Sequence, residues 1–164
     1  ARPSEELLPY YEVLQELFDE IPKALSGANV GVRFIGSLDL LPPDLQKSAK
    51  RLEERMPKGD RRVTIALAYG GRQEIVDAAR RFGAECGPEA GEAEFARYLY
   101  GPDLRDPELV IRTAGEQRLS NFLLWQSSYA ELVFSDALWP DFTPDDLDAA
   151  LDVYARRQRR FGGR

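Results

Sequence analysis

Residues 108–142 read ELVIRTAGEQRLSNFLLWQSSYAELVFSDALWPDF and carry the most informative pattern in the chain. The continuous apolar run Leu109-Val110-Ile111 predicts a buried strand over residues 108–114, which Gly115 interrupts. Apolar residues at helical spacing then predict a helix over residues 119–129, and residues 131–135 predict a second strand. A strand, a helix and another strand in this order indicate an α/β fold.

The same alternation of strands and helices continues on both sides of this stretch. The other expected elements are helix 4–24, strand 30–35, helix 44–56, strand 63–69, helix 73–82, loop 83–91, helix 92–100 and a terminal helix 144–160. This order predicts a single domain over residues 1–164, with a mainly parallel central sheet flanked by helices on both faces.

The composition argues against several classes of function. With 43% hydrophobic and 30% charged residues, the 164 residues have the composition of a globular domain. The net charge of −6 argues against general nucleic-acid binding, which needs a basic surface. One cysteine and no histidine exclude an intrachain disulfide, a Cys/His zinc cluster and a Ser-His-Asp triad. No run approaches the roughly 20 apolar residues of a membrane span, and we expect a cytoplasmic protein.

Two arginines and a serine, Arg112, Arg118 and Ser120, surround the junction between the first strand of this stretch and the following helix. Ligands of open α/β sheets bind just beyond the carboxyl ends of the strands, where this junction falls. The guanidinium fork and the free N–H groups of a helix start both favour an anion, most often phosphate. The junction is therefore a candidate phosphate site. The alternative is that the arginines form ordinary surface ion pairs with Glu108 or Glu116.

The segment IRTAGEQRLSNFLLWQSSYAEL, residues 111–132, resembles the cis-prenyltransferases, the undecaprenyl diphosphate synthase family. Three shorter matches follow in the family's order: Arg2-Pro3 resembles its NRP segment, Tyr69-Gly70-Gly71-Arg72 its NYGGR turn, and Arg160-Phe161-Gly162 its RxG motif. The resemblance implies an undecaprenyl diphosphate synthase-like fold. It also implies a transferase of isoprenoid biosynthesis, which condenses isopentenyl diphosphate with an allylic diphosphate to make a Z-polyprenyl diphosphate.

The long match implies roles for five residues. By resemblance, Arg112, Arg118 and Ser120 hold the diphosphate of isopentenyl diphosphate, with Glu116 in support, and Glu131 is a ligand of Mg²⁺. A hard cation with oxygen ligands that bridges substrate phosphates makes chemical sense at such a site. By its position alone, Glu131 is instead a solvated charge at the start of a strand.

The terminal matches imply contacts with the second substrate and with a second copy of the chain. By resemblance, Arg2 contacts the allylic diphosphate, such as farnesyl or geranyl diphosphate. Arg160 and Gly162 then cross a homodimer interface and help to close the partner's diphosphate site. The alternatives are that Arg2 is an exposed detail of the chain terminus, and that Arg160 and Gly162 form a basic helix end and its stop.

By the same resemblance, Arg72 and Glu74 are candidate supporting residues at the glycine turn. The family has Asn where this chain has Ala68, and often Asp where it has Glu74. The alternative is a strand-to-helix turn that only needs the backbone freedom of glycine.

A prenyl product would lie in an apolar tunnel. The helix over residues 4–24 offers Leu7, Tyr11, Leu14 and Phe18 as wall candidates, and ordinary core packing is the alternative for each. A lipid product would also allow peripheral association with a membrane.

The DGNGRWA-like loop of the family, which carries an aspartate central to catalysis, does not occur in residues 1–164. We therefore assign no catalytic residue, and expect the N-terminal strands of the family's sheet to be missing from these residues. Three explanations stay open: a fragment, a loop supplied by another chain, or lost catalysis. In the last case the chain would be a non-catalytic partner or binding subunit that keeps the diphosphate pocket and the dimer surface.

Overall fold

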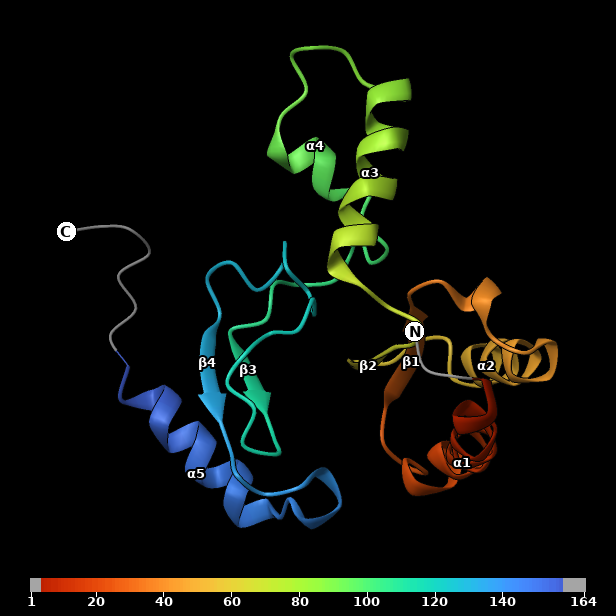
Figure 1. Ribbon diagram of the computed structural model, residues 1–164, viewed down its shortest axis with the longest axis vertical. Coiled ribbons are helices and arrows are strands. Elements are labelled where there is room, and N and C mark those ends of the chain that lie inside the picture. Colours follow the sequence, from red (N-terminus) through yellow and green to blue (C-terminus); the bar gives the residue numbers. More distant parts are fainter. Residues whose placement is uncertain (1–3, 158–164) are drawn as a thin grey trace. The chain divides into compact units, whose positions relative to one another are not determined.

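The structure is a computed structural model that describes the backbone of residues 4–157 and the side chains of residues 7–157 (Figure 1). The chain divides into two compact units, Ala1–Tyr69 and Gly70–Arg164, each with its own helices and strands. The expectation of a single domain over residues 1–164 stays a prediction.

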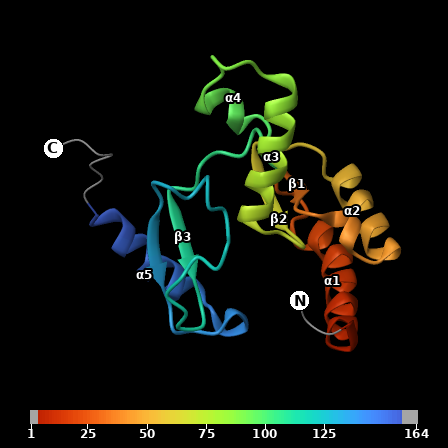
Figure 2. The same ribbon diagram turned by 45° about the horizontal axis from the view of Figure 1, so that its top comes forward.

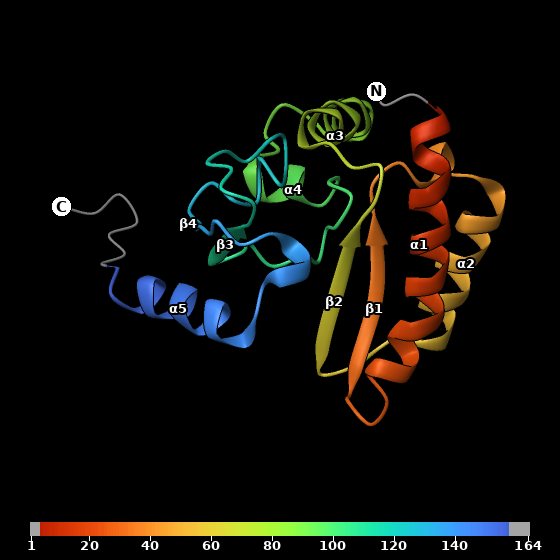
Figure 3. The same cartoon turned by 60° about the horizontal axis from the view of Figure 1, so that its bottom comes forward.

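The first unit consists of a parallel strand pair and two long helices. β1 (Val30–Ile35) pairs with β2 (Arg61–Ala66), with Val32 opposite Val63 in the register. The helices α1 (Ser4–Ala24) and α2 (Pro43–Arg55) lie on the same side of this pair (Figures 2 and 3). A short 3₁₀ turn, η1 (Leu38–Leu40), leads from β1 towards α2.

Apolar side chains of both helices and of β1 form the core of this unit. The rings of Phe18 on α1 and Phe34 on β1 meet edge to face, with their centroids 5.0 Å apart. The other buried members of this cluster are Leu14, Val32, Leu41, Leu45, Ala49, Leu52 and Leu67. Positions 14 and 18 of α1, like positions 45, 49 and 52 of α2, are three or four residues apart, so each helix buries a single stripe.

The second unit begins with α3 (Gly71–Glu85) and the short helix α4 (Glu92–Ala96). Its strands β3 (Leu109–Arg112) and β4 (Glu131–Phe134) are parallel, with Leu109 opposite Glu131 and Arg112 opposite Phe134. After a 3₁₀ turn, η2 (Trp139–Asp141), the helix α5 (Pro144–Ala155) packs beside β4 (Figures 1 and 2).

Most of the predicted elements are present, and both strand pairs are parallel as predicted. The described strands form two pairs, β1 with β2 and β3 with β4. The strand predicted over residues 63–69 begins earlier, because Arg61 and Arg62 pair with β1 although their side chains are exposed. It also ends earlier, at Ala66, two residues before Ala68 takes a left-handed backbone with φ 45°.

Several helix boundaries differ from the prediction. α3 continues to Glu85, so the loop expected over residues 83–91 begins too early; Gly83 lies in the helix with open space around it. The helix expected over residues 92–100 is shorter, since α4 ends at Ala96. α5 ends at Ala155, and part of the predicted helix 144–160 lies outside the described residues.

The helix predicted over residues 119–129 is wrong. Ser120, Asn121 and Leu123 have positive φ angles of 47°, 68° and 43°. A right-handed helix needs φ near −60°, so the chain turns sharply here. Residues 124–129 then form turns. Leu123 and Gln126 are nevertheless buried, so the segment packs inward without forming a helix.

Candidate anion-binding site

The residues predicted to bind phosphate lie together at the end of β3 and in the loop that follows it. Arg112 Nη1 donates a hydrogen bond to the Arg118 carbonyl oxygen at 2.5 Å, and Arg118 Nε donates to Ser120 Oγ at 3.1 Å. Arg118 Nη1 also forms an ion pair with Glu116 Oε2. The structure therefore joins Arg112, Glu116, Arg118 and Ser120 into one network of contacts.

This network is open to ligands. The side chain of Arg118 is 62% exposed, and that of Glu116 is 39% exposed. A guanidinium carries five donors, so Arg118 can bind an anion while it keeps its contact with Ser120. Arg118 thus fits both sequence interpretations, because it is ion-paired with Glu116 and also lies in a cluster suited to an anion.

The backbone of the loop brings these side chains together. Ala114 and Gly115 have φ angles of 65° and 66°. Their N–H groups donate to the carbonyl oxygens of Ala137 and Ser135 at 2.8 and 2.9 Å, which ties the start of the loop to the chain after β4. Since no helix begins at residue 119, an anion at this site would be held by side chains rather than by a helix N-terminus.

The glycine turn before α3 contacts the same loop. The Gly71 N–H donates to the Asn121 carbonyl oxygen and the Arg72 N–H to Asn121 Oδ1, each at 2.8 Å. A Cβ on Gly70 would lie 2.8 Å from Asn121 Nδ2, and one on Gly71 would lie 3.0 Å from Leu124 N. Glycine is therefore needed for close approach rather than for a left-handed backbone. The Arg72 side chain is exposed, and this residue joins the network through its N–H group.

Glu74, expected as a supporting residue, is completely buried. Its carboxylate accepts a hydrogen bond from the Tyr100 N–H at 2.9 Å and from Gln126 Nε2 at 3.2 and 3.3 Å. Gln126 Oε1 is also buried, and it has no partner among the described residues. Glu74 thus connects α3 to the end of the loop and does not face a ligand. Sequence reasoning missed Asn121 and Gln126, both of which lie inside the strongest motif.

Glu131 lies at the other end of the β3–β4 strand pair from Arg112. It begins β4 opposite Leu109, and its carboxylate forms an ion pair with Arg157 Nη1 at 3.4 Å. Arg112 is three residues beyond Leu109, which is roughly 10 Å along a strand. The register therefore places the backbones of Glu131 and Arg112 at opposite ends of the β3–β4 pair.

Glu131 offers Mg²⁺ a carboxylate at this end of the pair. Among the side chains described, those of residues 7–157, no three acidic or cysteine residues gather in a group that could hold a metal ion. Mg²⁺ usually takes one or two carboxylates, with substrate phosphates and water completing its shell. The Glu131 side chain, 22% exposed, fits one ligand of an ion that arrives with a diphosphate, and by itself it does not make a metal site.

Two of the tunnel-wall candidates belong to the core. Leu14 and Phe18 are 6% and 2% exposed, so the alternative of core packing is right for them, and Tyr11 packs against the same core. Leu7 is half-buried. The apolar side chains that α1 exposes are instead Leu8, Tyr10, Val13 and Leu17. The spacing of positions 10, 13 and 17 marks a second helical stripe that the sequence also contained.

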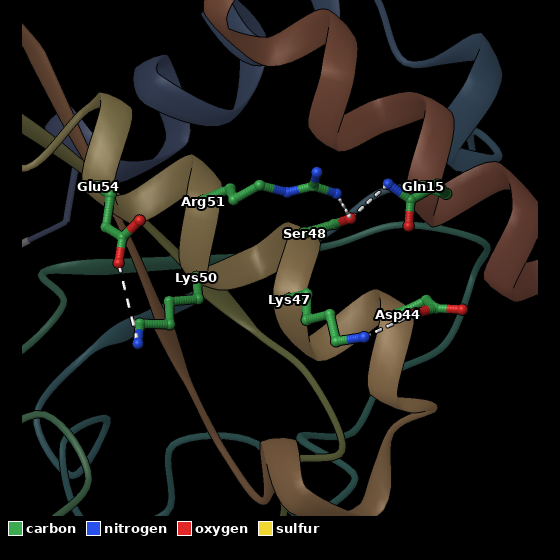
Figure 4. A pocket seen from close by; sticks show the side chains of 7 residues that line it. All are labelled: Gln15, Asp44, Lys47, Ser48, Lys50, Arg51 and Glu54. Atoms are coloured by element: carbon green, nitrogen blue, oxygen red, sulfur yellow. Dashed lines mark hydrogen bonds and ion pairs between the residues drawn. The ribbon is translucent and has the colours of Figure 1, made fainter.

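A hollow of about 670 Å³ lies on the surface of α1 and α2, and its lining includes none of the predicted site residues whose side chains are described (Figure 4). Its charges pair with one another, Lys47 with Asp44 at 3.3 Å and Lys50 with Glu54 at 3.9 Å. At its floor Ser48 Oγ accepts hydrogen bonds from Gln15 and Arg51 at 2.6 and 2.8 Å. Because its polar groups already have partners, we assign it no ligand.

The remaining site predictions, Arg2, Arg160 and Gly162, lie outside the described residues. None of the helices in the described part of the chain is long and apolar enough to cross a membrane.

Parallel strand pairs flanked by helices define an α/β protein, and its arginine cluster at the end of β3 has donors that suit an anion. Residues 1–162 match the model of the prenyltransferase family described as putative undecaprenyl diphosphate synthase, and the chain belongs to this family.

Relatives and solved structures agree with this assignment. A tritrans,polycis-undecaprenyl-diphosphate synthase (geranylgeranyl-diphosphate specific) of Methanopyrus kandleri is 43% identical over 170 residues, which cover 98% of this chain and 63% of that protein. An isoprenyl transferase of Thermotoga maritima is 43% identical over 167 residues, which cover 99% of this chain and 72% of that protein. The chain thus spans less than two thirds of the length of the Methanopyrus relative.

Two crystal structures show the same fold. Lavandulyl diphosphate synthase from Lavandula x intermedia, in complex with dimethylallyl diphosphate, matches with a TM-score of 0.91 and 35% identity, over 98% of this chain and 73% of that one. A probable undecaprenyl diphosphate synthase from Campylobacter jejuni matches with a TM-score of 0.87 and 35% identity, over 98% of this chain and 76% of that one. These matches confirm the predicted undecaprenyl diphosphate synthase-like α/β fold.

Proposed function

We propose that the protein is a cis-prenyltransferase that condenses isopentenyl diphosphate with an allylic diphosphate to make a Z-polyprenyl diphosphate. The observation that carries this proposal is the contact network of Arg112, Arg118 and Ser120 in a chain of this family. The names of the relatives support an allylic partner, since one is specific for geranylgeranyl diphosphate and one solved structure contains dimethylallyl diphosphate.

The network would bind the diphosphate of isopentenyl diphosphate. Arg112 and Arg118 supply charge-assisted donors, and bidentate contacts would fix the orientation of the group as well as its affinity. Ser120 Oγ can donate its own proton to a phosphate oxygen while it still accepts from Arg118 Nε. In the absence of ligand, Glu116 would hold the Arg118 guanidinium in place through their ion pair. When the diphosphate binds, it would become a second anionic partner of Arg118.

Mg²⁺ would be held by Glu131 together with diphosphate oxygens, and when bound it would neutralise the charge that develops on the departing diphosphate. Glu131 must then exchange at least part of its contact with Arg157. Arg157 is half-exposed, so its guanidinium can swing into solvent when a cation takes its place.

The prenyl chain would lie against the exposed apolar side chains of α1, namely Leu8, Tyr10, Val13 and Leu17. The family resemblance also supports an allylic diphosphate contact at Arg2, and a homodimer in which Arg160 and Gly162 reach the partner's site. A cytoplasmic enzyme with a lipid product would meet the membrane at its surface.

The test is incubation of the protein with Mg²⁺, farnesyl diphosphate and labelled isopentenyl diphosphate, followed by extraction of the label into an organic phase. Extracted label would support the proposal. Bound isopentenyl diphosphate without product would favour the non-catalytic subunit, and an absence of binding would refute the assigned site.

Arg118→Ala provides the sharper version of this test. Loss of charge-assisted hydrogen bonds should weaken isopentenyl diphosphate binding by about tenfold to a hundredfold. Arg80→Ala is the matched control, because Arg80 is an exposed, ion-paired arginine on α3 whose partner is Asp77. Equal effects of the two substitutions would show that the network is not the binding site.

A further inference from the structure

The N-terminus of α3 is capped by a residue from the loop that carries the anion site. The residue before the helix, Gly70, has no side chain that could cap it. Asn121, which is 49 residues beyond Arg72, takes over this role: its side-chain Oδ1 accepts from the Arg72 N–H and its backbone carbonyl from the Gly71 N–H. Two of the first N–H groups of α3 are therefore satisfied by a single asparagine.

The same asparagine directly follows Ser120, and both have a left-handed backbone, with φ angles of 68° and 47°. Asparagine tolerates this conformation better than most residues, whereas serine adopts it at a cost. The contacts with α3 hold Asn121, and with it the preceding peptide, in this arrangement. Without them the pair can relax towards right-handed values, which would rotate Ser120 Oγ away from Arg118 Nε.

A second attachment holds the other end of this segment. Gln126 binds the buried carboxylate of Glu74, so residues 121 and 126 are both anchored to α3. Just beyond the second anchor, Ser127 Oγ donates a hydrogen bond to the Leu123 carbonyl oxygen at 2.6 Å. The segment is thus fixed at two points on one helix, and Ser120 lies just before the first of them.

The contacts with Asn121 also indicate the role of the glycine turn, Gly70-Gly71-Arg72. Because the Gly71 and Arg72 N–H groups donate to Asn121, they are already occupied and do not need a phosphate to satisfy them. The close approach of Gly70 to Asn121 Nδ2 leaves no space for a ligand oxygen between them. The turn thus acts on the diphosphate through Asn121 rather than by direct contact.

We propose that Asn121 is a positioning residue, which caps α3 and thereby fixes Ser120 and Arg118 in the geometry that binds a diphosphate. This inference rests on the proposed function for its ligand, isopentenyl diphosphate. Whether Asn121 caps α3 can be measured without any ligand.

The experiment compares Asn121→Ala with Asn121→Asp. The alanine variant loses the Oδ1 acceptor, and isopentenyl diphosphate binding should weaken by about fivefold, the typical effect of losing a helix cap. The aspartate variant keeps an acceptor and adds a negative charge at a helix N-terminus, where it is favoured. It should therefore keep the cap, but its charge would repel a diphosphate bound at Ser120, so binding is compared between the parent protein and the alanine variant. Protection of the Arg72 N–H from hydrogen exchange should be lost in the first variant and kept in the second.

A double-mutant cycle with Ser120→Ala separates positioning from a general structural effect. If Asn121 acts through Ser120, Asn121→Ala should weaken binding clearly in the parent protein and little in the Ser120→Ala background. Equal losses in both backgrounds, or unchanged binding with Asn121→Ala, would overturn the proposal. If Asn121→Ala does not fold, Gly70→Ala serves instead, because its Cβ would displace Asn121 Nδ2.

The outcomes for the ligand and for the cap are distinct. A parent protein that binds no isopentenyl diphosphate, but keeps Arg72 N–H protection dependent on Asn121, would refute the proposed function and with it the positioning role. Protection of the Arg72 N–H that does not depend on residue 121 would refute the cap, whatever binds.

Discussion

Replacing Glu74 by alanine tests whether buried polar contacts hold α3 against the rest of the second unit. The Glu74 side chain is completely buried, and its carboxylate accepts hydrogen bonds from the Tyr100 N–H and from Gln126 Nε2. Alanine would leave both donors in the interior without this acceptor. The substitution should therefore lower the free energy of unfolding far more than a surface change would.

The contacts give the size of the effect. Each buried donor left without a partner costs about 1 to 3 kcal/mol. Removing a buried carboxylate also relieves its own desolvation, which offsets part of this sum. We expect a net loss of about 3 kcal/mol. With a urea m-value of about 1 to 3 kcal/mol per molar, the midpoint of unfolding should fall by roughly 1 to 3 M.

The assay is urea unfolding followed by tryptophan fluorescence, because Trp125 lies in this unit with its ring 4.7 Å from that of Phe95. Glu89→Ala removes an exposed carboxylate from the loop after α3 and is the matched control. Glu74→Gln keeps the side-chain volume and can donate a hydrogen bond to Gln126 Oε1, which has no partner among the described residues. Its loss in free energy of unfolding should therefore be less than half that of Glu74→Ala. A midpoint for Glu74→Ala no lower than that of the Glu89→Ala control would refute this reasoning.

Two further predictions concern charge. Glu116→Gln removes the anion that is paired with Arg118, and calorimetry should show isopentenyl diphosphate binding up to about fivefold tighter, because partly exposed ion pairs are weak; weaker binding would mean that Glu116 mainly orients Arg118. Hydrogen bonds from the Thr143 hydroxyl and backbone N–H hold the pKa of the Asp146 carboxyl below its ordinary value of 3.8. The ionised carboxylate therefore stabilises the folded protein above pH 3.8, and this stabilisation is lost as the pH falls through the lower pKa of the folded state. Urea midpoints measured below about pH 4 should fall less steeply for Asp146→Asn than for the parent, and parallel curves would contradict this assignment.

The sequence predicted the parts of the fold that local patterns determine. The two helices and two strands of the first unit follow from apolar spacing, and the network of Arg112, Arg118 and Ser120 follows from three residues that are close in sequence. The left-handed backbone at Ser120 and Asn121 was not predicted, although Ser and Asn are turn formers, because the apolar residues after them have helical spacing.

Contacts between distant parts of the chain could not be predicted from local patterns. Asn121 meets Arg72 across 49 residues, and Gln126 meets Glu74 across 52. By sequence, Ala68 differs from the family's Asn at this position. Its φ of 45° now gives that difference a physical meaning, since Asn adopts such a backbone more readily than Ala.

The fit of Gly70 against Asn121 bears on how this chain can be recombined with its relatives. A Cβ at position 70 would lie 2.8 Å from Asn121 Nδ2, so a bulkier residue at one position is acceptable only with a compensating change at the other. A chimera joined anywhere between these positions takes the two halves of the contact from different parents. Crossover points before residue 70 or after residue 126 take residues 70 and 121 from the same parent. Hybrids with crossovers at those points should therefore fold more often than hybrids joined between them.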